Sequence, residues 1–128
     1  MTFASPDFQK MYCVPLFPIV SRFFPEKEKD IVRQCLVAAL DGSFFPDWEF
    51  QTLFGIDRKT LAEIVDSWPH IDDTEENIFL AVNNSLANLV GYPHGSAEEW
   101  KKYISATPDE VRNILEYWKS GYDTLAEL

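Results

Sequence analysis

The chain has 128 residues, of which 21 are acidic and 11 are basic, and its formal net charge at pH 7 is -10. Hydrophobic residues make up 46% of the sequence, and a chain of this size buries about two thirds of its unfolded surface on folding. One folded domain over residues 1–128 is therefore predicted. The negative charge argues against binding to nucleic acid, because contacts to phosphates depend on Lys and Arg.

Membrane insertion and secretion are also not expected. The longest nearly apolar stretch, Met11 to Val20, contains Pro15 and Pro18 and is far shorter than the roughly 20 residues that span a bilayer. The N-terminal segment lacks a clear small-x-small cleavage site, and anionic lipids would repel an acidic protein. We expect a cytoplasmic protein without a membrane partner.

The first 24 residues predict an irregular arm that packs on the domain. Pro6, Pro15 and Pro18 prevent one long helix. Five phenylalanines in the same segment offer apolar anchors for packing.

Three helices are predicted in the next part of the chain. The first covers about 25–40, with acids in its first turn and apolar residues at helical spacing. The second is short and stops at Gly55. Asp57 can cap the third, which ends before Pro69.

The longest helix is predicted over about 74–90. Asp73 or Thr74 can cap its start, and Gly91 closes its end. Apolar residues cover much of its circumference, which is typical of a helix in the middle of a bundle.

Two capping boxes predict the last two helices. Ser96 and Glu99 have the required spacing, as do Thr107 and Glu110. The final helix is expected to leave 122–128 as a short tail. No segment alternates with the period of a strand, so the predicted fold is an all-α, single-domain bundle of about six helices around the 74–90 helix.

Motifs for the common cofactors and metals are missing from the sequence. The five glycines form neither a P-loop nor a dinucleotide motif, and there is no Cys-x-x-Cys or His-Glu-x-x-His. No cofactor and no metal are therefore expected. Cys35 lies in an apolar helical stretch, where we predict a buried hydrophobic side chain rather than a reactive thiol.

Both histidines follow an aromatic residue and a proline, His70 after Trp68 and His94 after Tyr92. We interpret both as residues of structural turns between helices. The alternative is a small hydrolase or transferase in which His70 acts as acid or base with Asp66 or Asp72.

The acidic residues are unevenly distributed. No Lys or Arg occurs between Lys59 and Lys101, a stretch that holds eight acids. These are Glu63, Asp66, Asp72, Asp73, Glu75, Glu76, Glu98 and Glu99. Carboxylates favour helix starts, which explains many of the acids but not the missing cations. We interpret the stretch as a surface for a basic partner, and the alternative is a surface that serves only solubility.

Asn77, Asn84 and Asn88 share one face of the 74–90 helix. Asn is a poor helix former, so three on one face need a structural or functional reason. We favour hydrogen bonds to the backbone of the N-terminal arm over a recognition surface.

Trp48 is a candidate exposed anchor, because it lies between Asp47 and Glu49 in a segment crowded with aromatic residues. This segment supports a further hypothesis, a regulatory or assembly subunit that binds through Trp48.

The favoured hypothesis is a non-enzymatic protein that docks on a basic partner and blocks it. An immunity or inhibitor protein of a bacterial toxin, such as a nuclease, would act in this way, with a monomer favoured over an oligomer. The predicted partner-binding residues are Asp66, Trp68, Asp72, Asp73, Glu75, Glu76, Glu98, Glu99 and Trp48.

Overall fold

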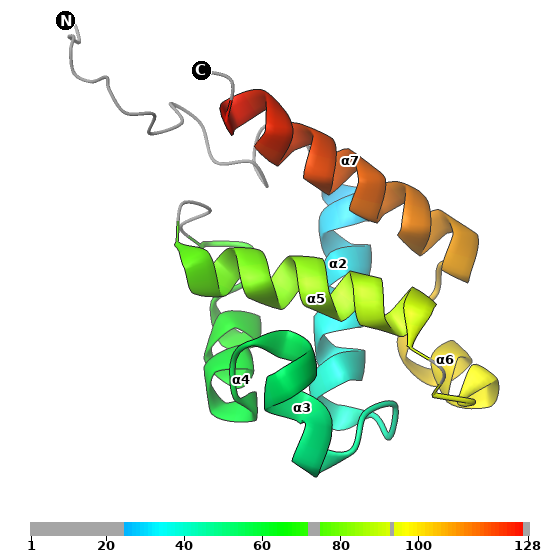
Figure 1. Cartoon of the computed structure of the whole chain (residues 1–128). Coiled ribbons are helices and arrows are strands. Elements are labelled where there is room, and N and C mark those ends of the chain that lie inside the picture. Colours follow the sequence, from blue (N-terminus) through cyan, green and yellow to red (C-terminus); the bar gives the residue numbers. More distant parts are fainter. Residues whose placement is uncertain (1–24, 72–74, 93, 127–128) are drawn as a thin grey trace, which may run out of the picture.

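Six α-helices form the part of the chain that the computed structural model describes, residues 25–71, 75–92 and 94–126 (Figure 1). They are α2 (Glu26–Asp41), α3 (Asp47–Phe54), α4 (Arg58–Ser67), α5 (Glu76–Gly91), α6 (Ala97–Tyr103) and α7 (Pro108–Ala126). No strand occurs in these residues. The predicted all-α, single-domain bundle is confirmed. The N-terminal arm, Asp72, Asp73 and the proposed Thr74 cap lie outside the described residues.

Local sequence chemistry sets several helix ends as predicted. The carboxylate of Asp57 accepts a hydrogen bond of 2.9 Å from the backbone N–H of Thr60 and caps α4. Thr107 and Glu110 form the expected reciprocal capping box at the start of α7. Gly55 ends α3 with a φ of 74°, a left-handed conformation that glycine adopts without steric cost.

The predicted capping box at Ser96 and Glu99 is wrong. The Ser96 side chain caps nothing at the start of α6, and its hydroxyl donates to the carbonyl oxygen of His94. Glu99 accepts hydrogen bonds from the backbone N–H and the hydroxyl of Ser43, at 3.1 and 2.9 Å. Its carboxylate therefore ties α6 to the loop between α2 and α3.

The predicted short tail over 122–128 is also wrong, because α7 continues through Gly121 as far as Ala126. One glycine inside a helix costs only about 1 kcal/mol relative to Ala. No proline follows it in the sequence, so nothing forces the helix to stop there.

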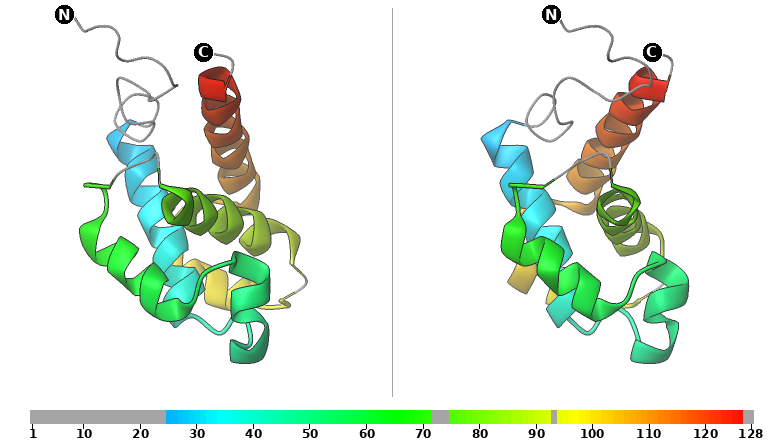
Figure 2. Two further views of the ribbon diagram at one scale, coloured as in Figure 1. Left: turned by 60° about the vertical axis from the view of Figure 1, so that its left-hand side comes forward. Right: turned by 90° about the vertical axis from the view of Figure 1, so that its left-hand side faces the viewer.

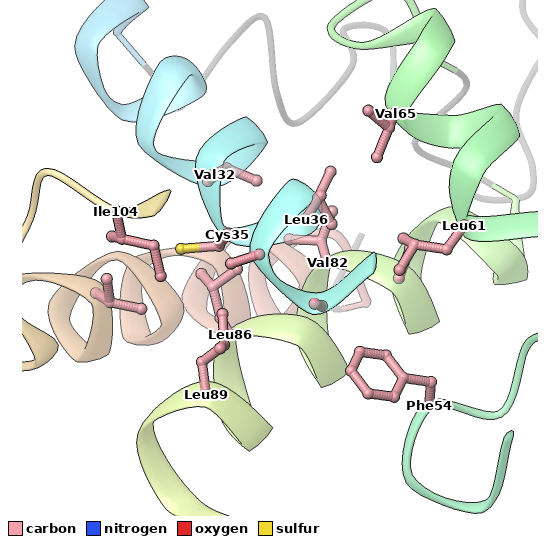
Figure 3. Close-up of a cluster of buried hydrophobic side chains, with 14 of the residues drawn as sticks. Val32, Cys35, Leu36, Phe54, Leu61, Val65, Val82, Leu86, Leu89 and Ile104 are labelled. Carbon is pink, nitrogen blue, oxygen red and sulfur yellow. The ribbon is translucent and has the colours of Figure 1, made fainter. Parts of the chain in front are cut away.

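The helix α5 occupies the predicted central position. It packs against α2, α3, α4 and α7, and it crosses α2 in the views of Figures 1 and 2. Its Val82, Leu86 and Leu89 face the core side chains of α2 and α4 (Figure 3). Burying each such side chain contributes about 1.5–3 kcal/mol, so this helix organises the core.

Cys35 lies inside this core, as predicted. The side chain is fully buried, with its sulfur beside Ile104 (Figure 3). Burial raises the pKa of the Cys35 thiol to about 12. The thiol is thus protonated at neutral pH, which makes it a poor nucleophile.

Candidate functional site

The end of α4 and the start of α5 bring part of the predicted acidic stretch together. Glu63 and Asp66 are exposed on α4, while Glu75 and Glu76 are exposed where α5 begins. The two helices contact each other. None of these four carboxylates forms an ion pair with a described residue. We call Glu63, Asp66, Glu75 and Glu76 the acidic face.

A groove of about 320 Å³ is lined by two members of the acidic face, Glu63 and Glu75. Its lining residues are Thr60, Glu63, Ile64, Ser67, His70, Ile71, Glu75, Asn77 and Ile78. The lining includes two glutamates and neither Lys nor Arg. Such a groove favours a positively charged ligand, because each carboxylate attracts a cation and the described lining holds no Lys or Arg that would compete.

His70 lies in this groove without a catalytic arrangement around it. Its imidazole forms no hydrogen bond or ion pair with a described carboxylate, and the exposed Asp66 is not its partner. The Ser67 hydroxyl donates to the backbone carbonyl of Glu63, so it is not bonded to His70. The backbone N–H of His70 donates to the Ser67 carbonyl at 2.7 Å, as the turn interpretation predicts. Asp72 lies outside the described residues.

Glu98 and Glu99 lie at the opposite end of α5 from the acidic face (Figure 1). A helix of 16 residues is about 24 Å long, so the predicted acidic stretch divides into two separate regions. Glu98 is exposed. The hydrogen bonds from Ser43 hold the pKa of Glu99 below its ordinary value, and that carboxylate has a structural role in the loop.

The structure corrects the prediction that Trp68 contacts a partner. Its side chain is buried, and its indole N–H donates to the backbone carbonyl of Lys29 at 2.9 Å. Trp68 continues the apolar stripe of α4 and packs toward α2, so its ring is not available to another protein.

Trp48 is exposed, as predicted, with 81% of its surface accessible in the first turn of α3. The other three tryptophans, Trp68, Trp100 and Trp118, are buried. An exposed indole of this kind is a frequent anchor in protein interfaces. That role for Trp48 stays a prediction.

A second groove has a volume of about 660 Å³. One of its lining residues is Asp47, which directly precedes Trp48 in the sequence. Its lining residues are Leu40, Asp41, Gly42, Ser43, Phe44, Phe45, Pro46, Asp47, Arg58, Tyr92 and His94. Five of these residues belong to the loop between α2 and α3, and Tyr92 and His94 follow the end of α5. We call it the Trp48 groove, because Asp47 lines it and Trp48 is the next residue.

Arg58 holds this loop in place, a role that was not predicted from the sequence. Its guanidinium donates to the backbone carbonyls of Ala39, Leu40 and Phe45, at 3.3, 2.6 and 3.0 Å. Its Nε donates to Asp47 at 2.9 Å. The cation thus satisfies carbonyls at the end of α2, where the helix dipole favours positive charge.

One sequence feature could have indicated this role for Arg58. It is the first residue of α4, a position where the helix dipole disfavours a cation. Its guanidinium also lies 4.2 Å from the centre of the Phe50 ring. A cation placed against its own helix dipole therefore signals a partner elsewhere in the fold.

His94 is a structural turn residue, as predicted. Its Nδ1 accepts a hydrogen bond from the backbone N–H of Ser96 at 3.0 Å. Nε2 lies 2.9 Å from the carbonyl oxygen of Leu89, so this nitrogen carries the proton and donates. The ring packs edge-on against Phe44, with centroids 4.9 Å apart.

Two asparagines of α5 bind the backbone of α3, whereas the N-terminal arm, their predicted partner, lies outside the described residues. Asn84 donates to the carbonyl of Phe54 at 2.8 Å, and Asn88 donates to that of Leu53 at 3.1 Å. These carbonyls belong to the last turn of α3, where carbonyl oxygens lack N–H donors inside their own helix. The two side chains thus cap α3, and Asn77 is exposed.

Comparison with protein-family models, curated proteins and solved structures gave no match. Among the described helices, none has both the length and the apolar composition needed to cross a bilayer. The described residues also hold no group of three or more acidic, His or Cys side chains placed to bind a metal ion.

Proposed function

We propose that this chain is a non-enzymatic binding protein whose acidic face docks on a basic protein partner. The observation that carries the proposal is a set of four exposed carboxylates, Glu63, Asp66, Glu75 and Glu76, that pair with no described residue. Two of them, Glu63 and Glu75, line a groove whose described lining has no Lys or Arg. Like charges repel one another, so a surface that serves only solubility usually mixes both signs.

Local helix chemistry accounts for only half of the acidic face. Glu75 and Glu76 lie at the start of α5, where the helix dipole stabilises carboxylates. Asp66 is in the last turn of α4, which holds no basic residue. A carboxylate there opposes the dipole, so its presence supports a role outside the fold.

A basic partner would also bind quickly. The chain carries a net charge of -10, and complementary fields raise association rates by about 10- to 1000-fold at low salt. Fast capture suits an inhibitor, which must occupy its target before the target acts. The specific form of the proposal is therefore an inhibitor of a basic protein, such as the immunity protein of a bacterial toxin.

Affinity capture from the native host tests this proposal. The bait is the intact chain, and its charge-reversal variant is Glu63→Lys with Asp66→Lys. Asp30→Lys with Glu116→Lys is the matched control, because both positions are exposed on α2 and α7 and the net charge changes equally. One basic protein, held by the wild type and the control but lost with the acidic-face variant or at raised salt, is expected. Equal capture by all three baits would overturn the proposal.

A further inference from the structure

We infer that His94 acts as a pH-sensitive latch, which holds the connection between α5 and α6 against the α2–α3 loop only while its imidazole is neutral. Uptake of a proton by the ring opens the turn over 94–96 and separates it from Phe44. The two ring nitrogens of His94 carry this inference, which is independent of the proposed function.

Only one protonation state of His94 satisfies the hydrogen bonds of both ring nitrogens. Nδ1 accepts from the backbone N–H of Ser96 at 3.0 Å, so this nitrogen carries no proton. Nε2 lies 2.9 Å from the carbonyl oxygen of Leu89, which can only accept, so Nε2 donates. A neutral imidazole has one donor and one acceptor nitrogen, whereas the protonated ring has two donors. The turn is therefore built around the neutral ring.

A proton on Nδ1 would break the contact with Ser96. Two N–H groups would then face each other across 3.0 Å, where neither can accept. The part-buried N–H of Ser96 would lose its acceptor, which is unfavourable for a buried donor. The Ser96 hydroxyl cannot replace the ring, because it donates to the His94 carbonyl oxygen. The protonated ring therefore has to leave this position.

The ring of His94 joins three segments of the fold. Its hydrogen bonds connect the last turns of α5 at Leu89 with the start of α6 at Ser96. The ring also packs edge-on against Phe44, with centroids 4.9 Å apart, and lies 6.4 Å from Phe45. Both phenylalanines are buried residues of the α2–α3 loop. Displacement of one ring thus loosens the contact between this loop and the end of α5.

The turn has the freedom to open without disturbing the core. Gly95 has a φ of 67°, and glycine moves easily between backbone conformations. No heavy atom of the described chain lies within 4 Å of the position that a Cβ of Gly95 would take. His94 itself is only half-buried. Opening can therefore stay local to this connection.

The charged groups around His94 attract a proton, although none forms an ion pair with the ring. Asp41, Asp47, Arg58 and Tyr92 line the same groove as His94. Glu49 accepts from the Tyr92 hydroxyl, and α6 contributes Glu99 and Tyr103, which contact the same loop. No described carboxylate pairs with the His94 ring. Four carboxylates and one guanidinium thus leave the surroundings negative, while the hydrogen bonds of the turn exclude the proton.

The latch should open at mildly acidic pH. A free imidazole takes up a proton near pH 6.5, so about one ring in ten is still neutral at pH 5.5. Because only the open turn accommodates the protonated ring, acidification favours the open turn. The carboxyls of Glu99 and Glu110 have a pKa lowered from 4.5. They titrate below this range, so they do not contribute to the opening.

Amide hydrogen exchange of Ser96, measured by NMR at pH 7.5 and pH 5.5, tests the inference. We expect its protection factor, the exchange rate relative to an unstructured chain, to fall about tenfold in the wild type. His94→Asn should show no such fall, because the Asn side chain also accepts from the backbone two residues on and has no titratable group. His70→Asn is the matched control, since His70 is the other histidine and is exposed, and it should behave as the wild type.

An unchanged protection factor of Ser96 in the wild type would overturn the inference, and so would an equal fall in His94→Asn. Nitrogen chemical shifts of the wild-type imidazoles provide a test that needs no variant. They should show the proton of His94 on Nε2 at pH 7.5. A proton on Nδ1 at that pH, or a protonated ring at pH 5.5 beside a Ser96 amide that is still protected, would also overturn it.

Discussion

The guanidinium of Arg58 donates to the carbonyl oxygen of Leu40 across 2.6 Å, so a cation from the start of α4 caps the end of α2. The last turn of α2 holds no basic residue of its own. One side chain thus joins three consecutive helices, because it also binds the loop at Phe45 and the first residue of α3 at Asp47. The shape of the Trp48 groove depends on this arrangement.

Replacing Arg58 should therefore destabilise the whole domain. Arg58→Ala leaves part-buried carbonyls at the end of α2 without a donor, and we expect the free energy of unfolding to fall by about 3 kcal/mol. Arg58→Lys should retain only part of the lost free energy of unfolding, since an ammonium group lacks the planar, forked donor geometry of a guanidinium. Urea denaturation measures both effects. The exposed neighbour Lys59→Ala is the control, and an Arg58→Ala variant as stable as this control would disprove the role of Arg58.

The asparagine cap on α3 makes a second prediction. Asn84→Ala removes the donor to the Phe54 carbonyl, which should cost about 1–2 kcal/mol. Amide hydrogen exchange should become faster in α3 before it does so in α7. Asn77→Ala provides the comparison, because Asn77 is an exposed residue of the same helix and should change neither quantity. Equal exchange in the two variants would contradict the cap.

A hydroxyl buried in the core leads to the prediction of a stabilising substitution. Ser85 is fully buried in α5, and its Oγ has no hydrogen-bond partner among the described residues. An unsatisfied buried hydroxyl is destabilising, and Ala is the better helix former. Ser85→Ala should raise the free energy of unfolding by about 1 kcal/mol, which appears as a higher Tm. A lower Tm would show that the hydroxyl has a favourable interaction.

Stability should also depend on the protonation of Glu99. Hydrogen bonds from Ser43 are the main cause that lowers the pKa of this carboxyl in the folded state. A carboxyl with a lowered folded pKa stabilises the fold above its unfolded pKa of about 4.3 and loses this effect as the pH falls through the folded value. The wild type should lose its stability advantage over Glu99→Gln in that acidic range. A constant difference between pH 7 and pH 3, in urea denaturation at each pH, would contradict this account.

The sequence predicted features whose partners lie nearby in the chain. The cap at Asp57 and the box at Thr107 and Glu110 join residues only three positions apart. Because such geometry follows from one turn of helix, composition and spacing were sufficient to predict it. The apolar surface of the central helix was equally informative, since a helix with few polar sides has to be covered by others.

Long-range partners could not be inferred in the same way. Ser96 and Glu99 have the spacing of a capping box, yet Glu99 binds Ser43, 56 positions away. Asn84 binds a carbonyl 30 positions away. The hydrogen-bond partners of Glu99 and Asn84 depend on which helices pack together. Residue spacing along one helix carries no information about this packing. The length of α5 likewise separates Glu98 from the acidic face, so the acidic stretch of the sequence forms two regions in the fold.

The association rate constant of the captured basic partner tests the central claim most directly. Stopped-flow mixing at low and raised salt compares the wild type with Glu63→Lys/Asp66→Lys and with the matched control Asp30→Lys/Glu116→Lys. If the acidic face is the docking surface, its reversal should slow association about tenfold or more at low salt. The control variant should slow association much less, and raised salt should reduce the difference in association rate between the two variants. Equal rates for the two variants at both salts would contradict the claim that these carboxylates guide and hold the partner.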